Sequence, residues 1–150
     1  MIKILGSILI LSASIFACYS YEKHEKRSLD SLKELCSFIK HIKSKIEYFS
    51  MPLDRIYMSY EEKSPLISSI IENGFESVKA YFNKTELNIL LPFFSSIGNG
   101  FKKEEVCLCD YTICELEKII ESKSTEYPNK IKAFRAIALF CGFCMVILLI

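Results

Sequence analysis

The chain contains no tryptophan, and it has few residues that interrupt regular structure, with 5 glycines and 4 prolines among 150 residues. So little glycine and proline excludes a collagen-like or linker-like chain. A hydrophobic content of 51% likewise excludes a disordered one. A surplus of charge of either sign is also missing, since 19 basic and 18 acidic residues leave a net charge of +1. No overall field would therefore attract nucleic acid or an acidic substrate, and we expect no nucleic-acid partner.

The common catalytic signatures are absent as well. The sequence has no G-x-S-x-G, no phosphate-binding G-x-x-x-x-G-K, no H-E-x-x-H and no glycine-rich dinucleotide loop. Two pairs of neighbouring carboxylates, Glu61 with Glu62 and Glu104 with Glu105, diverge on a helix and cannot form an acid–base couple. We therefore expect a protein that is not an enzyme, with no catalytic residue and no cofactor.

The sequence contains seven cysteines, the residues in its composition that are most relevant to metal binding or redox chemistry. Cys107, Cys109 and Cys114 cluster, but a tetrahedral zinc site needs a fourth ligand, and the two histidines are distant in sequence. Cys109 is predicted to lie in the core, and the other two are predicted to be partly buried fillers. Cys141 and Cys144 form a C-x-x-C in an uncharged segment, where nothing activates a thiolate. We expect no metal site and no thiol chemistry.

Two long runs without charge, residues 4–19 and 136–150, are the strongest feature that is present. The first is about 24 Å long as a helix at about 1.5 Å per residue, and flanking lysines and tyrosines lengthen it toward the interfaces. The second has no charge at all, and a domain this small cannot surround it with core. We predict transmembrane segments at residues 1–21 and 133–150, with a bundle of residues 22–132 between them.

Basic residues flank the middle segment at both junctions. They are Lys23, Lys26, Arg27, Lys33 and Lys40 after the first run, and Lys123, Lys130, Lys132 and Arg135 before the second. By the positive-inside rule, this distribution predicts a cytoplasmic bundle with both termini outside the cytoplasm.

An alternative reading concerns the end of the first run. Ile15, Phe16, Ala17 and Cys18 resemble the cleavage site of a bacterial lipoprotein signal, whose cysteine carries the lipid. A phenylalanine beside the cleavage position and a single Lys3 before the run fit such a signal poorly. The alternative function is a lipid-anchored extracellular helical binding protein.

The middle segment predicts helices throughout. Its first helix carries an unbroken stripe of apolar residues at spacings of three and four: Leu32, Leu35, Ile39, Ile42, Ile46 and Phe49. Ser28 or Asp30 is the expected N-cap. Ser50, Met51 and Pro52 end this helix and begin the next at Leu53.

Three more helices are expected after this pair. Residues 65–82, after Ser64, form one with a broad apolar arc, and Thr85 caps another, which bends at Pro92 and ends at residues 98–100. A long helix follows, which Pro128 either kinks or separates from the last run. Its stripe is Val106, Cys109, Ile113, Leu116 and Ile120. The prediction is an all-α bundle of about five to six helices, tethered at both ends.

Short motifs at the end of the first bundle helix and at the end of the chain resemble a known family. Glu47 with Pro52 and Leu53, and a G-x-x-x-x-I-L-L pattern from Gly142, are similar to the stage III sporulation protein AB family of endospore-forming bacteria. Where that family carries Leu-Gly, then Asp and Gln, this chain has Phe101 and Lys102, then Glu105 and Cys109.

This resemblance implies a function. Such proteins have a soluble part similar to the cytoplasmic helical domain of type II secretion F platform proteins. They belong to a channel-like complex between mother cell and forespore, beside the cytoplasmic AA ATPase of the same operon. The resemblance thus implies a non-enzymatic membrane platform whose partners are the other stage III sporulation A-operon proteins and the lipid bilayer. Self-association is an open alternative. The residues expected to build the turn and core are Leu32, Leu35, Ile39, Ile42, Ile46, Phe49, Pro52 and Leu53.

Overall fold

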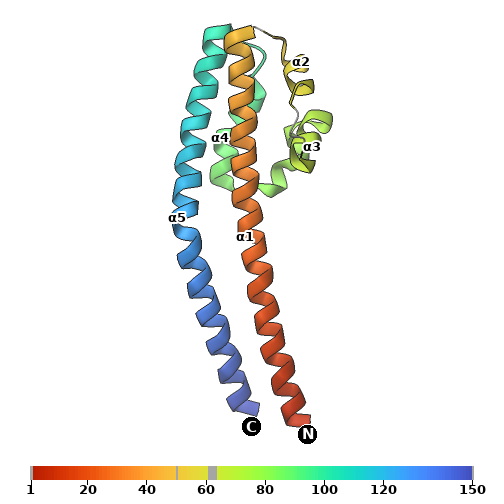
Figure 1. Ribbon diagram of the computed structural model, residues 1–150, viewed down its shortest axis with the longest axis vertical. Helices are drawn as coiled ribbons and strands as arrows, with labels where there is room; N and C mark the ends of the chain where they lie inside the picture. Colours follow the sequence, from red (N-terminus) through yellow and green to blue (C-terminus); the bar gives the residue numbers. More distant parts are fainter. Residues whose placement is uncertain (1, 50, 61–63, 150) are drawn as a thin grey trace. The chain divides into compact units, whose positions relative to one another are not determined.

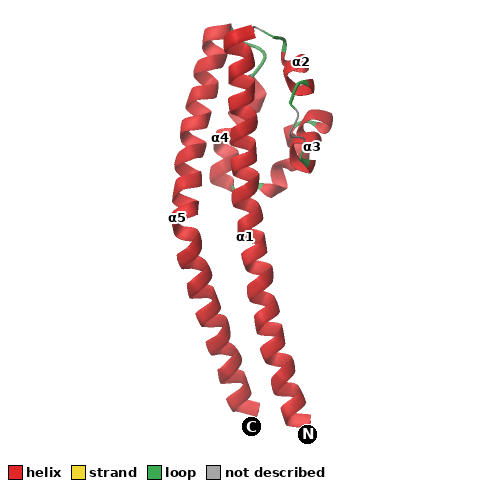
Figure 2. Ribbon diagram, viewed as in Figure 1, coloured by secondary structure: helices red, strands yellow, loops and turns green. Residues whose placement is uncertain are grey.

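The computed structural model describes residues 2–49, 51–60 and 64–149, the side chains of residues 2–5, 7, 8, 10, 11, 146, 148 and 149 excepted. Over these residues the chain is helical apart from short connections, and no strand occurs (Figure 2). In chain order the elements are α1 (Ile2–Phe49), α2 (Leu53–Met58), α3 (Pro65–Asn73), the 3₁₀ helix η1 (Phe75–Tyr81), α4 (Lys84–Ser96) and α5 (Lys102–Leu149) (Figure 1). The prediction of an all-α fold with about six helices is confirmed. Ser50, Glu61 and Glu62 lie outside the described residues.

The chain divides into two compact units. Unit 1 comprises Met1–Arg27 and Ser122–Ile150, and unit 2 comprises Ser28–Glu121. The first part of α1 and the last part of α5 belong to unit 1, and the remaining parts of both helices belong to unit 2 with the four short elements.

Unit 2 has a core that begins with the apolar stripe of α1. Leu32, Leu35, Ile39 and Ile42 are fully buried, and Ile46 is 4% exposed. Apolar residues three and four positions apart share one face of a helix, so a single side of α1 supplies all five. Burying a side chain of this size contributes about 1.5–3 kcal/mol relative to leaving it exposed.

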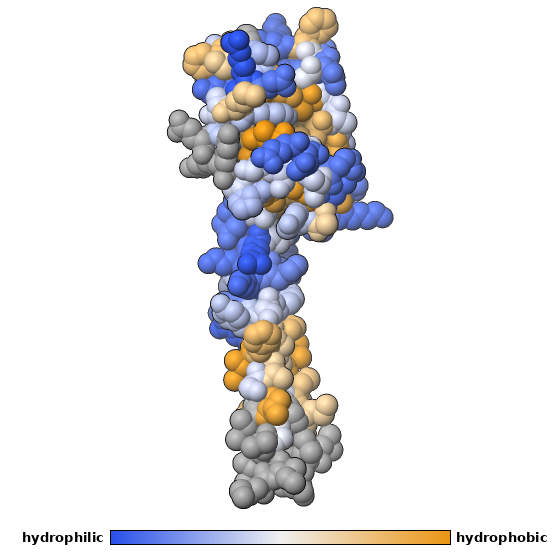
Figure 3. Space-filling model, turned by 90° about the vertical axis from the view of Figure 1, so that its right-hand side faces the viewer, coloured by the Kyte–Doolittle hydropathy of each residue, from blue (hydrophilic) through white to orange (hydrophobic). Residues whose placement is uncertain are grey.

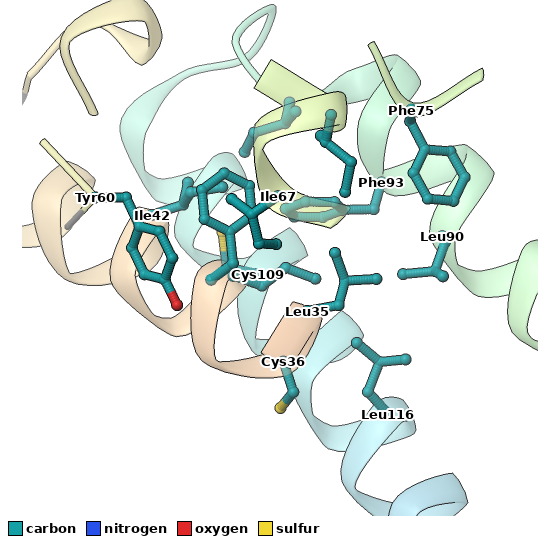
Figure 4. Close-up of a cluster of buried hydrophobic side chains, with 14 of the residues drawn as sticks. Leu35, Cys36, Ile42, Tyr60, Ile67, Phe75, Leu90, Phe93, Cys109 and Leu116 are labelled. Carbon is teal, nitrogen blue, oxygen red and sulfur yellow. The ribbon is translucent and has the colours of Figure 1, made fainter. Parts of the chain in front are cut away.

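Every other element of unit 2 adds to this core. In Figure 4 the side chains of Leu35, Leu90 and Phe93, from α1 and α4, point toward one another. Phe38 packs against Tyr60 edge-on, with ring centroids 5.0 Å apart. The further buried residues are Ile56 of α2, Ile67 and Ile70 of α3, Phe75 and Val78 of η1, and Cys109 and Leu116 of α5. The core role predicted for Cys109 is confirmed.

The start of α3 agrees with the sequence, and the start of α4 does not. Ser64 caps α3, its hydroxyl accepting a hydrogen bond from the backbone N–H of Ile67 at 3.2 Å. The cap of α4 is Asn83, not Thr85. The Asn83 side chain accepts from the N–H of Glu86 at 3.0 Å, and the Glu86 carboxylate accepts from the N–H of Asn83 at 2.8 Å. This reciprocal pair satisfies two backbone donors that a helix start leaves open.

The single helix predicted over residues 65–82 is wrong. α3 ends at Asn73, and Gly74 has a φ of +77°, a left-handed conformation that a residue with a side chain rarely adopts. The 3₁₀ helix η1 then runs from Phe75 and packs against α3. Glycine at this position therefore separates two short elements that periodicity alone had joined.

The two long helices also differ from the expectation. α1 continues through Ser28 and Asp30 and begins at Ile2, so neither residue is an N-cap. Residues 7–49 contain no glycine or proline, the residue types that break a helix. Serine and aspartate favour the N-cap position, but they are also tolerated inside a helix, and Ser28 and Asp30 therefore do not start a new one. α5 likewise continues past Pro128, which excludes the alternative that this proline separates two helices.

Candidate functional site

Unit 1 is a pair of antiparallel helical segments whose apolar side chains are largely exposed. Among its described side chains, Ile131 is the only buried hydrophobic one, at 7% exposure. Orange, hydrophobic side chains accordingly gather on its surface in the lower part of Figure 3. The exposed ones, each 45–72% accessible, are Leu9, Ile15, Phe16, Tyr19, Ile137, Leu139, Phe140, Phe143, Met145 and Ile147. Two helices cannot enclose such residues between them, so this surface is the first candidate site.

Specific contacts join the two segments of unit 1 where its composition changes from apolar to charged. The rings of Tyr21 and Phe134 stack, with centroids 4.3 Å apart and planes 16° from parallel. Directly beside them, Arg135 of α5 forms an ion pair with Glu22 of α1. A hollow of about 280 Å³ next to this pair is lined by Ile15, Cys18, Tyr19, Glu22, Arg135 and Leu139. These contacts set which faces of the two segments meet.

The sequence predicts transmembrane segments at residues 1–21 and 133–150, whose described residues belong to α1 and α5. Within the part of the chain that the structure describes, no helix combines the length and the apolar character needed to cross a bilayer.

Of the residues expected to form the apolar stripe of α1, five are buried and one is exposed. Leu32, Leu35, Ile39, Ile42 and Ile46 lie in the core of unit 2, as described above. Phe49, expected in the same stripe, is 62% exposed instead. It is the last residue of α1, and its ring lies under the Lys45 ammonium at 5.1 Å. Helical spacing places Phe49 on the apolar face of α1, but among the described residues no neighbouring element covers it.

The turn after α1 contacts the connection that precedes α5. Pro52 is the N-cap of α2, and its carbonyl accepts from the N–H groups of Arg55 and Ile56 at 3.1 and 3.2 Å. Leu53 is half-buried, and a Cβ added to Gly98 would stand 3.2 Å from its Cδ2. Gly98 also has a φ of +90°, a left-handed conformation that favours glycine, so a side chain there would be strained in its backbone and crowded against Leu53. From the sequence, residues 98–100 are predicted only as the end of a helix.

The cysteines of unit 2 are split between its interior and its surface. Cys109 is fully buried, and burial raises the pKa of its thiol to about 12. Cys107 and Cys114, expected to be partly buried, are exposed. Among the described residues, no group of three or more histidine, cysteine or acidic side chains is placed to hold a metal ion.

A shallow apolar hollow of about 340 Å³ lies between α3, η1 and α4, and periodicity did not reveal it. Phe75 and Phe94 form one wall, stacked with centroids 4.5 Å apart and planes 10° from parallel. Tyr57, Ile71 and Leu91 also line the hollow. Burial raises the pKa of Tyr57 to about 12, which keeps its phenol protonated. The hollow exists because Gly74 turns the chain between α3 and η1.

On the polar surface of unit 2, ion pairs connect the two long helices. Lys40 of α1 pairs with Glu117 of α5 at 2.6 Å, and Lys43 pairs with Asp110 at 2.7 Å. Lys40, Glu117 and Asp110 are more than half exposed and Lys43 is 29% exposed, so solvent screens both pairs and each contributes little to stability. Their main effect is on specificity, because they favour the pairing of α1 with α5 in this register.

Comparison with known proteins gives a family and nothing closer. The family model described as stage III sporulation protein AB matches two overlapping stretches of the chain, residues 3–73 and 61–150. No curated protein and no solved structure gives a significant match.

Proposed function

The chain belongs to the stage III sporulation protein AB family, and from that membership we propose that it is a non-enzymatic membrane platform in the channel complex between mother cell and forespore. A role in sporulation follows from the family itself. The platform role rests on a structural difference between the two units. Unit 2 has a core of its own, whereas unit 1 leaves most of its described apolar side chains exposed.

In this proposal unit 1 contributes the membrane anchors, formed by residues 1–21 and 133–150. Residues 4–19 and 136–150 contain no charge, and their described apolar side chains are mostly exposed, as expected of side chains that face lipid. The bundle, residues 22–132, lies in the cytoplasm of the mother cell, and both termini lie on the other side of the membrane. The basic residues at both junctions support this orientation.

Unit 2 is then the part that meets protein partners, namely the AA ATPase and other proteins of the stage III sporulation A operon. The surface that we propose for such contacts is the apolar hollow walled by Phe75 and Phe94. Apart from Glu76 and Ser95, the side chains that line it are apolar or aromatic, so recognition there would rest mainly on shape and apolar contact. No cofactor enters this function.

The orientation is tested by labelling with a membrane-impermeant maleimide. The variant used has serine at Cys18, Cys141 and Cys144, which leaves Cys107 and Cys114 as the exposed thiols of unit 2. We expect labelling only after the cells are permeabilised. The matched control also carries Cys107→Ser and Cys114→Ser, and it should stay unlabelled until denatured, because Cys36 and Cys109 are buried.

Labelling of intact cells would reject the platform and favour the alternative, a lipid-anchored extracellular binding protein modified at Cys18. That alternative also predicts loss of membrane retention in Cys18→Ser, whereas the platform predicts that this variant stays in the membrane fraction.

A further inference from the structure

The acidic and basic residues of α1 in unit 1 face different surroundings. Glu22 and Glu25 are half-buried on the side that meets α5. Glu22 forms the ion pair with Arg135, and the negative charge of Glu25 acts on Lys130. The carboxylates of this stretch are therefore directed toward α5.

Lys23, Lys26 and Arg27 are exposed. Their spacing is i, i+3 and i+4, which places all three on one face of α1. Within the part of the chain that the structure describes, none of them has an ion pair. Like charges at this spacing destabilise a helix, so packing within the chain does not explain the cluster.

The same face of α1 is apolar one and two turns earlier. Phe16 and Tyr19 precede Lys23 by seven and four residues, and they are 71% and 63% exposed. From Phe16 to Lys26 the face is about 15 Å long at about 1.5 Å per residue. Whatever covers it is apolar at one end and anionic at the other, and these are the two ends of an anionic phospholipid.

We propose that this face of α1 binds an anionic phospholipid, with the acyl chains against Phe16 and Tyr19 and the phosphate against Lys23, Lys26 and Arg27. The lysine and arginine stems reach along the apolar surface while their charged ends meet the headgroup. This proposal rests on the membrane anchoring of unit 1. The apolar end of the face favours a lipid over free phosphate or a nucleic acid.

The test uses the full chain reconstituted in phosphatidylcholine liposomes, with spin-labelled phosphatidylglycerol or spin-labelled phosphatidylcholine as the probe. Electron spin resonance measures the fraction of each probe held at the protein. We expect the protein to prefer the anionic lipid by about fivefold or more, since one cation near an anionic headgroup contributes about that factor. High salt should reduce this preference.

The variant Lys23→Gln/Lys26→Gln/Arg27→Gln should bind the two probes almost equally. The matched control, Lys33→Gln/Lys84→Gln/Lys103→Gln, removes three exposed cations of unit 2 and should keep the preference. Circular dichroism checks that both variants are folded. An unchanged preference in the first variant would overturn the proposal.

Two further arms distinguish other sources of the anion. Inorganic phosphate, added at constant ionic strength, should leave the preference unchanged, and displacement of the lipid would show a phosphate site. An oligonucleotide that binds the wild-type chain and not the first variant, without any lipid preference, would show a nucleic-acid site. A chain that does not enter neutral liposomes would reject the membrane anchor itself, whereas one that enters without preference would reject this inference alone.

Discussion

Units 1 and 2 each contain part of α1 and part of α5, but they differ in whether the apolar side chains of these helices are buried. In unit 2 the apolar face of α1 belongs to a core to which α2, α3, η1, α4 and α5 also contribute, and residues such as Leu32 and Ile39 are fully buried. In unit 1 α1 has α5 as its described neighbour, and residues such as Phe16 and Phe140, both 71% exposed, remain uncovered. The same two helices therefore have their apolar side chains covered in one unit and left exposed in the other.

The largest effect is expected where the core of unit 2 is interrupted. Ile39→Asp places an unpaired charge at a fully buried position and should cost at least about 3 kcal/mol in the free energy of unfolding. Ser37→Asp, at an exposed position of the same helix, is the control and should change stability little. Thermal unfolding of the full chain in detergent, followed by circular dichroism, measures both. Equal midpoints would remove Ile39 from the core.

A smaller effect is expected at the start of α4. Glu86 is fully buried, and Glu86→Ala leaves the backbone N–H and side-chain amide of Asn83 without their carboxylate acceptor. The loss should be about 1–2 kcal/mol. Glu72→Ala, an exposed carboxylate of α3, should be close to neutral in the same unfolding experiment. A cost that is the same in both variants would show that the capping pair does not stabilise unit 2.

The contact between the segments of unit 1 should be weaker still. Glu22 and Arg135 are 35% and 56% exposed in their side chains, so solvent screens the pair. A double-mutant cycle with Glu22→Gln and Arg135→Gln should give a coupling free energy below about 1 kcal/mol. A coupling well above this limit would mean that unit 1 is held together from within, against the comparison drawn above.

The smallest effect on folding is expected from the exposed aromatic residues of unit 1. Phe16→Ser/Phe140→Ser should leave the unfolding of unit 2 within about 0.5 kcal/mol of the wild type. The same variant should be released from membranes more readily by alkaline carbonate, if lipid covers these side chains. Phe101→Ser, in unit 2 and 81% exposed, serves as the control and should be retained like the wild type. Unchanged retention of the double variant would contradict the proposed anchor.

Much of unit 2 could be predicted from periodicity, and the errors occur at the ends of elements. Spacing identifies which face of α1 is apolar, but it does not say where the neighbouring elements stop, and Phe49 therefore proved exposed. Thr85 and Asn83 are both plausible caps. Glu86, three residues after Asn83, is the signal that would have distinguished them. The apolar hollow depends on the positive φ of Gly74. That conformation could not be predicted from the sequence, because a glycine within an apolar arc also fits a continuous helix.

By itself, the sequence determined the all-α class, the buried stripe of α1 and the concentration of apolar residues at both ends, because these follow from side-chain type and a local period. Only the tertiary structure decided that Cys107 and Cys114 are exposed, and that Glu22 and Glu25 are half-buried while Lys23, Lys26 and Arg27 are exposed. Those outcomes depend on which element stands opposite each face of a helix. Helical periodicity specifies the faces, and packing between distant segments decides which of them are covered.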